Sequence, residues 1–243
     1  MSPSKAPPQT LLEGAALFLD FDGTLVELAE TPDAIRVDPE LPSLLKRVAT
    51  RLGGRLAIVS GRSIQDLERH MDCAGVAVSG SHGLELRLAD GEHIPLSAPV
   101  DLNEAREEIR SFAASLHVLL VEEKPRSVAL HYRQAPERQK EVEEFMAALA
   151  KRSGLTVQAG KMVLELRPKG ADKGDAVRAL MAEPQFAGAR PLFVGDDLTD
   201  EDAFEAAAAL GGAGILVGPE RPSAAVWRLP NVAAVAAWLR GAA

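Results

Sequence analysis

Runs of consecutive apolar residues recur along the chain, and each run stops at a polar residue or a glycine. Such runs are typical of strands that are buried on both faces of a parallel sheet. They predict strands at residues 16–21, 56–61, 76–80, 192–196 and 214–218. Helical spacing of apolar residues separates several of these runs. This alternation predicts an α/β fold with a doubly wound, mainly parallel sheet.

Capping signals predict where four helices begin. The expected first residues or caps are Asp38, Ser63, Asp172 and Thr199. Small polar side chains are favoured there because they accept hydrogen bonds from the first backbone N–H groups of a helix. Asp38 is followed by Pro39, which suits a first turn. Residues 1–9 carry three prolines and are expected to form a loose tail.

The middle of the chain follows a different pattern. Residues 84–88 alternate apolar and charged side chains, as a half-exposed strand does. Further strands are predicted at 118–121, 128–132 and 162–166, and amphipathic helices around Ile109 and Val142. Two helices on one face of an antiparallel sheet form a simple α+β domain. We therefore expect a core of residues 1–83 and 169–243, interrupted by an inserted domain at 84–168.

Composition narrows the class of protein. The chain has 243 residues and a formal net charge of −8, which disfavours binding to nucleic acid or to anionic membranes. The apolar runs are shorter than the ~18 residues of a membrane span. Cys73 is the single cysteine, so no disulfide can form within the chain. We expect a cytoplasmic protein without nucleic-acid or membrane partners.

A pair of carboxylates follows the first predicted strand, in the sequence Asp20-Phe21-Asp22-Gly23-Thr24. Ligands of open α/β sheets bind at the carboxyl ends of the strands. Alternate residues of a strand point the same way, so both acids are expected on one side. A plain turn with solvated acids is the alternative. Their place at a strand end favours a catalytic or ligand-binding role over a plain turn.

A second acidic cluster follows another predicted strand. Asp196 and Asp197 come directly off that strand, and Asp200 lies three residues further on. Such acids can also serve as a helix N-terminus, where the helix dipole favours negative charge. Two acidic strand ends that meet in one sheet would form a hard, oxygen-rich site for Mg²⁺.

Two further features are suited to an anion. Ser60 and Gly61 end the second predicted strand, where a hydroxyl and backbone N–H groups can hold a phosphate; a helix cap is the alternative. Lys173 stands at a predicted helix start, which the helix dipole disfavours. A bound phosphate would account for it, and a solvated surface lysine is the alternative.

These elements, in this order, resemble the haloacid dehalogenase (HAD) superfamily of phosphatases. Within it the chain is similar to the trehalose-6-phosphate phosphatase family from about residue 15 to 240. The segments that carry the resemblance are 20–25 (DFDGTL), 59–62 (VSGR), 80–85 (GSHGLE), 128–133 (VALHYR), 163–170 (VLELRPKG) with Lys173, and 195–201 (GDDLTDE). The resemblance implies an HAD-like, Rossmann-type core with an inserted α+β cap.

The resemblance also implies a mechanism. Asp20 would be the nucleophile that forms an aspartyl phosphate, and Asp22 the general acid and base. Mg²⁺ would be held by Asp20, the backbone carbonyl of Asp22, and Asp196. The phosphoryl oxygens would be bound by Ser60, Gly61 and Lys173. Asp197 and Asp200 would support these groups from behind rather than bind the metal directly.

The cap is expected to recognise a small-molecule sugar phosphate. Candidate sugar-binding residues are His82, Glu85, Lys124, His131, Arg133, Lys161 and Glu165. Each could instead be a solvated or ion-paired surface residue. Gly83 and Gly170 flank the insertion and are hinge candidates. The expected activity is hydrolysis of trehalose 6-phosphate by a monomer, as the last step of trehalose synthesis. A phosphatase for sucrose phosphate or mannosyl-phosphoglycerate, or a catalytically silent binding module, remains an alternative.

Overall fold

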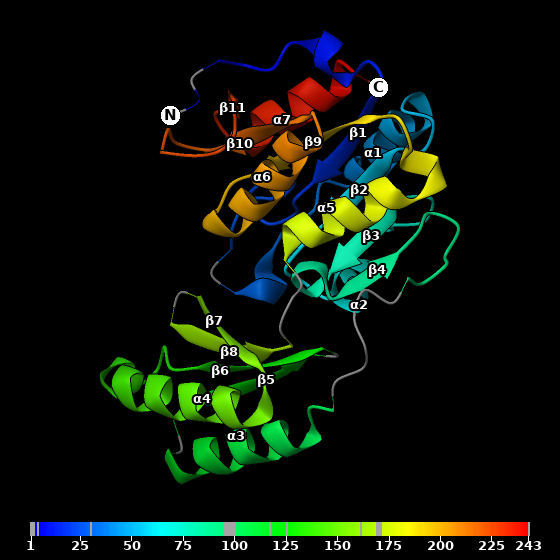
Figure 1. The fold of residues 1–243 in the computed structure, drawn as a ribbon. Helices are drawn as coiled ribbons and strands as arrows, with labels where there is room; N and C mark the ends of the chain where they lie inside the picture. The colour runs from blue at the N-terminus through cyan, green and yellow to red at the C-terminus, as the bar shows by residue number, and fades with distance from the viewer. Residues whose placement is uncertain are drawn as a thin grey trace. The chain divides into compact units, whose positions relative to one another are not determined.

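The computed structural model describes residues 3, 5–29, 31–94, 101–116, 118–124, 126–160, 162–168 and 172–242. The chain divides into two compact units (Figure 1). The first comprises Met1–Leu96 and Ala171–Ala243, and the second comprises Ser97–Gly170. Each unit has its own sheet and is described by itself below.

The first unit is built on a seven-stranded sheet with the order β11-β10-β9-β1-β2-β3-β4 among the described residues. The strands are β1 (Ala15–Leu19), β2 (Leu56–Val59), β3 (Ala77–Gly80), β4 (Glu85–Arg87), β9 (Arg190–Gly195), β10 (Ala213–Val217) and β11 (Trp227–Leu229). All neighbouring pairs are parallel except β3 and β4. The predicted α/β fold with a mainly parallel sheet is confirmed.

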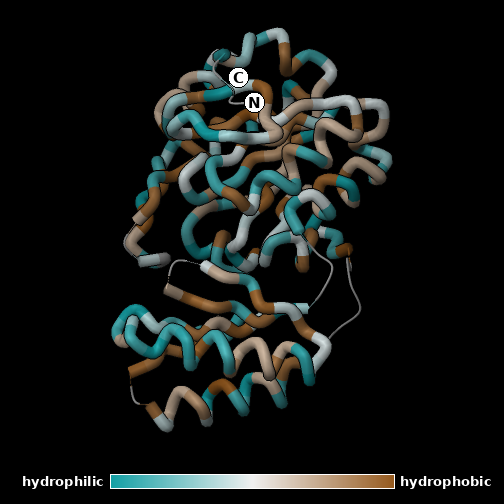
Figure 2. The backbone as a smooth tube through the Cα atoms, turned by 60° about the vertical axis from the view of Figure 1, so that its left-hand side comes forward, coloured by the Kyte–Doolittle hydropathy of each residue, from teal (hydrophilic) through white to brown (hydrophobic). Residues whose placement is uncertain are grey.

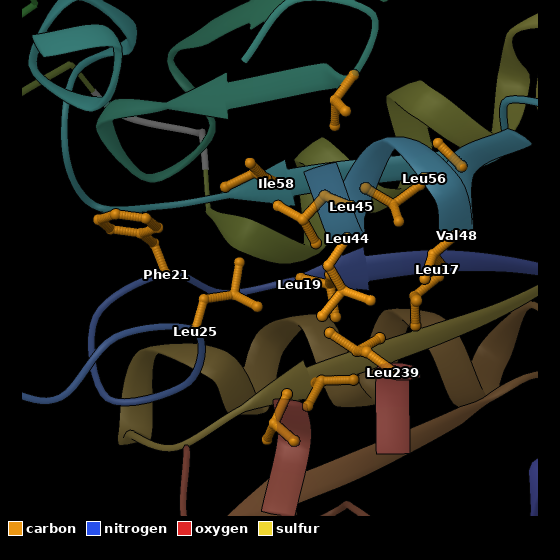
Figure 3. Packing of buried hydrophobic residues seen from close by; sticks show 14 of the residues in the cluster. Leu17, Leu19, Phe21, Leu25, Leu44, Leu45, Val48, Leu56, Ile58 and Leu239 are labelled. Carbon is orange, nitrogen blue, oxygen red and sulfur yellow. The ribbon is translucent and has the colours of Figure 1, made fainter. Parts of the chain in front are cut away.

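Strand β1 lies in the middle of this sheet and is buried on both faces. Leu17 and Leu19 point into one core cluster, and Ala16 and Phe18 point into the other. The first cluster includes residues of α1 (Leu41–Arg51), α2 (Ile64–His70) and α7 (Val232–Arg240). The second includes residues of α5 (Lys173–Ala182) and α6 (Glu201–Ala209). Figure 3 shows the packing of the first cluster, with Leu17, Leu19, Leu44, Leu45 and Val48 labelled.

Two of the four expected helix starts are confirmed and two are wrong. Ser63 caps α2, and Asp172 caps α5 in a reciprocal pair of hydrogen bonds with Asp175. Asp38 does not cap α1, because it closes a turn just before the helix and Leu41 N donates to its carbonyl. Thr199 does not begin α6, because Asp197 caps a short 3-10 turn, Leu198–Asp200 (η6), that precedes the helix.

Strand β4 belongs to the first unit, although residues 84–88 were expected in the inserted domain. Glu85–Arg87 pairs antiparallel with β3, and Gly80 lies opposite Glu85 in that register. The chain therefore turns back along β3 through Ser81–Gly83 (η3) and adds one more strand to the core sheet. The alternating pattern arises because this strand lies at the edge of the sheet.

The N-terminal segment is not a loose tail over its described part. The carbonyl of Lys5 accepts a hydrogen bond from Arg228 N at 2.8 Å, and Gln9 Nε2 donates to the carbonyl of Trp238 at 3.0 Å. Gln9–Leu12 (η1) then forms a short 3-10 turn that leads into β1. These contacts fasten the start of the chain to its last strand and helix.

The second unit is an antiparallel sheet with the order β5-β6-β8-β7. Its elements are α3 (Asn103–Leu116), β5 (Leu120–Lys124), β6 (Ser127–His131), α4 (Gln139–Ser153), β7 (Thr156–Gly160) and β8 (Val163–Arg167). The strand expected at 118–121 is therefore shifted toward the C-terminus, because its pairing with β6 runs on to Lys124. Strand β7 was not predicted, since most of its residues are polar or small.

Alternate residues of the central strands separate the two faces of this sheet. Val128 and Leu130 of β6 join Leu164 and Leu166 of β8 in a core cluster with residues of α3 and α4. In Figure 2 these helices alternate between hydrophilic and hydrophobic segments, as amphipathic helices do. The residues between these positions, such as Glu165, belong to the opposite face. Over the described parts of both units, no helix combines the length and the apolar character that crossing a bilayer requires.

Candidate active site

The loop that follows β1 places two carboxylates at the carboxyl end of the sheet. Asp20 is 4% exposed, and its backbone N–H donates to the carbonyl of Val194 at 2.9 Å. The chain then closes a tight turn, in which Gly23 N–H donates to the carbonyl of Val26 at 2.8 Å. Gly23 has φ of 78°, and a Cβ there would collide with the carboxylate of Asp196. Glycine is therefore required at this point by both conformation and space.

Lys173 joins two buried carboxylates at the centre of the site. Its Nζ donates to Asp20 Oδ1 at 2.7 Å and to Asp200 Oδ1 at 2.5 Å. All three side chains are almost fully buried. Burial alone would lower the pKa of Lys173, but the charges of Asp20 and Asp200 outweigh burial and raise that pKa. Lys173 therefore stays cationic between two acids.

Burial has the opposite effect on the acids of this group. It raises the pKa of Asp20 well above the usual value, against the lowering effect of Lys173. It likewise raises the pKa of Asp200. For Asp196, burial and then the charges of Asp200 and Asp197 raise the pKa to about 6. Clustered acids of this kind resist losing all their protons unless further positive charge arrives.

Asp200 holds the acidic loop in place from within the protein. Its Oδ2 accepts hydrogen bonds from the backbone N–H groups of Asp196 at 2.8 Å and Asp197 at 3.0 Å. Asp197 in turn accepts from Thr199 N at 2.8 Å and Thr199 Oγ1 at 2.7 Å. Both oxygens of Asp200 are thus engaged, one with Lys173 and one with the loop. Asp200 therefore holds Lys173 and the loop of Asp196 and Asp197 in position.

The sequence did not predict that Arg221 also holds this loop in place. Arg221 Nη2 donates to the carbonyl of Asp197 at 2.7 Å, and its Nη1 pairs with Glu201. Glu201 also accepts from Ala224 N at 2.8 Å. No sequence motif marks Arg221, which lies in a loop 24 residues beyond Asp197.

The carboxylates of Asp20, Asp196 and Asp200 offer oxygen atoms that all lie within 4.8 Å of one another. Oxygen-only donors of this kind suit Mg²⁺. The tight packing of Asp196 against Gly23 fixes one of these donors beside the loop that carries Asp20. Since Asp200 is already committed at both oxygens, Asp20 and Asp196 are the residues whose carboxylates fit a metal.

Asp22 is bound at both carboxylate oxygens by an arginine. Arg62 Nε donates to Asp22 Oδ2 at 2.7 Å, and Nη2 donates to Asp22 Oδ1 at 2.9 Å. A third bond runs from Arg62 Nη1 to Asp66 Oδ2 at 2.7 Å. The Arg62 side chain is only 9% exposed. The sequence showed Arg62 beside Ser60 and Gly61 but gave no sign that it would pair with Asp22.

Ser60 and Gly61 lie at the end of β2, next to β1. Ser60 is buried, and its Oγ accepts a hydrogen bond from Arg62 N at 3.1 Å, which leaves its own O–H to donate. A Cβ at Gly61 would meet the imidazole of His82 at 2.6 Å. The structure therefore brings Ser60, Gly61 and His82 together.

Glu85 has an internal role in the structure. Its Oε1 accepts from Ser81 Oγ at 2.8 Å and its Oε2 accepts from Ile64 N at 3.0 Å. Both oxygens thus tie the turn after β3 to the start of α2. Glu85 therefore braces this turn, and a sugar contact by Glu85 stays a prediction from the sequence.

In the second unit, three of the predicted sugar-binding residues lie on its sheet. Lys124 Nζ donates to Glu165 Oε2 at 3.0 Å, and Ser127 Oγ donates to Glu165 Oε1 at 2.5 Å. His131 Nε2 lies 2.9 Å from Glu122 Oε2. Arg133 is exposed just after β6, and Lys161 lies outside the described residues, as does Gly170.

Comparison with known proteins identifies the family. The trehalose-phosphatase family model matches residues 18–232. A probable trehalose-phosphate phosphatase of Sinorhizobium fredii is 43% identical over 229 residues, which span 93% of this chain and 86% of that protein. The trehalose-6-phosphate phosphatase of Escherichia coli K12 is 36% identical over 233 residues, which span 92% of this chain and 85% of that protein.

Solved structures agree with this result. The C-terminal domain of a Candida albicans trehalose-6-phosphate phosphatase superposes with a TM-score of 0.78 at 25% identity, over 99% of this chain and 98% of that one. A HAD-superfamily phosphatase of Bacteroides thetaiotaomicron shares the fold, with a TM-score of 0.65 at 16% identity over 92% of each chain. The resemblance carried by the sequence motifs is confirmed, and the chain belongs to the trehalose-phosphatase family.

Proposed function

We propose that this protein hydrolyses trehalose 6-phosphate to trehalose and phosphate, with Asp20 as the nucleophile and Mg²⁺ as the cofactor. The observation that carries the proposal is the buried ion pair between Lys173 and Asp20, 2.7 Å long, at the carboxyl end of the central strand. A carboxylate and an ammonium at this edge of an open sheet suit an anionic substrate. The family supports the choice of sugar phosphate.

The chemistry follows in two displacements at phosphorus. An oxygen of Asp20 attacks phosphorus, the bond from phosphorus to the sugar oxygen breaks, and that oxygen takes a proton from Asp22. Asp20 then carries the phosphoryl group as an acyl phosphate. Asp22 next removes a proton from a water molecule, whose oxygen attacks phosphorus and releases inorganic phosphate from Asp20.

Binding of the phosphoryl group falls to donors around Asp20. The ammonium of Lys173 has three N–H donors, of which Asp20 and Asp200 take two. The third can bind a phosphoryl oxygen. The Ser60 hydroxyl and the backbone N–H of Gly61 add neutral donors at the neighbouring strand end, as a phosphate cradle does.

Asp20 and Asp196 would hold Mg²⁺ through their carboxylates, together with the backbone carbonyl of Asp22. When bound, the metal would supply positive charge that reduces repulsion between the carboxylates and the phosphoryl group. Asp197 and Asp200 keep the loop that carries Asp196 in place. The pKa of Asp196, raised to about 6 by burial and its acidic neighbours, is what such a site is expected to have before a cation neutralises it.

We further propose that the second unit acts as the cap and supplies the sugar contacts. Lys124, His131, Arg133 and Glu165 offer the mixture of donors and acceptors that sugar hydroxyls require. Glu165 carries most weight, because it accepts from both Lys124 and Ser127 and so organises the sheet's polar face. Lys161 stays a candidate from the sequence alone.

The alternatives predict different behaviour. A phosphatase for another sugar phosphate, such as sucrose phosphate or mannosyl-phosphoglycerate, would keep the core chemistry and differ in its second unit. A silent binding module would not need a nucleophile, yet Asp20, Lys173 and Asp196 are all in place. The net charge of −8 disfavours a nucleic-acid partner and fits a monomeric enzyme that acts on a small molecule. The cytoplasmic location stays a proposal from the sequence.

The test is a panel of sugar phosphates with the purified protein and Mg²⁺, in which released phosphate gives kcat/KM for each. Trehalose 6-phosphate is expected to have the highest value. Glu165→Gln is expected to raise KM for trehalose 6-phosphate and to leave hydrolysis of p-nitrophenyl phosphate unchanged. A higher kcat/KM for another sugar phosphate would overturn the choice of substrate.

A further inference from the structure

The turn between β3 and β4 has an unusual backbone. Ser81, His82 and Gly83 have φ of 51°, 54° and 95°, so three consecutive residues lie in the left-handed region. Only glycine enters that region without steric cost, and the first two residues here carry side chains. Such conformations persist where the surroundings enforce them, and they gather at functional sites.

The surroundings enforce this turn from two directions. Ser81 N donates to the carbonyl of Arg62 at 2.7 Å, and His82 N donates to the carbonyl of Ser60 at 3.0 Å. On the other side, a Cβ at Gly83 would collide with the carbonyl of Asp172, which caps the helix that begins with Lys173. The strained turn is thus bonded to the loop after β2 and packed against the start of α5.

Glu85 completes the bracing of the turn. It accepts from Ser81 Oγ at 2.8 Å and from Ile64 N at 3.0 Å, and so links the turn to the first residue of α2. The position of His82 is therefore fixed by four backbone or side-chain hydrogen bonds around it.

This bracing fixes the position of the His82 imidazole ring. Cε1 and Nε2 of His82 would both lie 2.6 Å from a Cβ at Gly61, so the ring lies directly against Gly61. The ring thus lies beside Ser60 and Gly61, within the first unit.

We propose that the imidazole of His82 binds the phosphoryl group of the substrate, as a donor beside Ser60 and Lys173, rather than the sugar. The proposal rests on the proposed function for its assignment of a phosphomonoester site. An imidazole N–H is a good donor to an anionic oxygen. The ring lies over Gly61 in the unit that carries Asp20, whereas the proposed sugar contacts belong to the other unit.

The test compares binding of inorganic phosphate by wild type and by His82→Asn, using isothermal titration calorimetry with Mg²⁺ present. Asparagine tolerates the left-handed region, so the turn is kept while the imidazole is lost. His82→Gly serves as a second variant, since glycine takes this conformation without strain. His93→Asn, at an exposed histidine of the same unit, is the matched control.

The Kd for inorganic phosphate is expected to rise about tenfold or more in both His82 variants and to stay unchanged in His93→Asn. The Ki of trehalose as a product is expected to stay unchanged in all three. An unchanged Kd for phosphate in folded His82→Asn or His82→Gly would overturn the proposal, as would a rise in the Ki of trehalose alone. Because the titration uses inorganic phosphate, a different preferred sugar would not affect the result.

Discussion

Arg62 and Asp22 form a two-point ion pair, in which Nε meets Oδ2 at 2.7 Å and Nη2 meets Oδ1 at 2.9 Å. The same guanidinium binds Asp66 on α2 and lies 5.9 Å from the centre of the Phe21 ring. The Arg62 guanidinium is planar and has Asp22, Asp66 and Phe21 around it. It therefore fixes the orientation of the Asp22 carboxylate. If Asp22 is the general acid, it must release one of these bonds to deliver a proton.

Arg62→Lys is expected to lower kcat for trehalose 6-phosphate about tenfold or more, because lysine cannot bind both oxygens of Asp22 in a plane. The loss is expected to be smaller with p-nitrophenyl phosphate, whose leaving group needs no proton. The measurement is the ratio of the two kcat values in wild type and variant. Arg69→Lys, at an arginine of α2 that is 67% exposed, should leave that ratio unchanged. Equal losses on both substrates would indicate a purely structural role for Arg62.

Gly23→Ala is expected to abolish most activity, whereas Gly75→Ala is expected to keep it. Both glycines have φ of 78°, so each substitution brings similar backbone strain, about 1 kcal/mol. Only at Gly23 would the new Cβ also strike the carboxylate of Asp196, while at Gly75 it meets nothing within 4 Å. Thermal unfolding and kcat, measured together, separate strain from displacement of Asp196. Similar kcat values for the two variants would contradict the assignment of Asp196 to the site.

Much of the first unit could be predicted from the sequence, because a strand that is buried on both faces must be a continuous run of apolar residues. The runs that became β1, β2, β3, β9 and β10 are apolar on both faces, as their places inside the sheet require. Edge strands leave a weaker trace. Strand β4 was assigned to the wrong unit, and β7 and β11 were not predicted, because half-exposed strands need no continuous apolar run.

The site was predictable wherever a residue stands at a strand end or a helix start. Asp20, Asp196 and Lys173 come together as their positions at these ends suggested. The arginine contacts around the site were not predictable. Arg62 and Asp22 are 40 residues apart in sequence, and Arg221 and the backbone carbonyl of Asp197 are 24 residues apart. Sequence spacing carries no information on such contacts unless a motif records them.

Lys173→Ala is expected to lower the free energy of unfolding by about 3–5 kcal/mol, because it leaves the carboxylates of Asp20 and Asp200 buried without a cation. The matched control is Lys46→Ala, since Lys46 and Asp72 form an ion pair of 2.8 Å whose side chains are 44% and 61% exposed. Because that pair is exposed to solvent, the change is expected to leave the free energy of unfolding nearly unchanged. Urea unfolding of both variants measures the difference. Equal costs would show that Lys173 is not the buried partner of the two acids.

Cys73 provides a prediction about pH. Burial raises the pKa of its thiol to about 11, so the native thiol is expected to react slowly with iodoacetamide at pH 8. Because the folded pKa is the higher one, the stability that this group contributes is complete below about pH 8.5 and is lost as the pH rises toward the folded value. Alkylation rates of native and urea-unfolded protein across this range give the test, with Cys73→Ala as the unlabelled control. Equal rates at pH 8 would contradict the burial of the thiol.

The central claim is that Asp20 attacks phosphorus, and Asp20→Asn tests it most directly. Asparagine has the same size and can still accept a hydrogen bond from Lys173, and Asp200 remains to pair with that lysine. The variant is therefore expected to unfold at a temperature close to that of wild type. Release of phosphate from trehalose 6-phosphate, measured with excess Mg²⁺, is expected to fall about a thousandfold or more. A folded variant that keeps kcat within about tenfold of wild type would contradict the account, because a true nucleophile costs far more than that when removed.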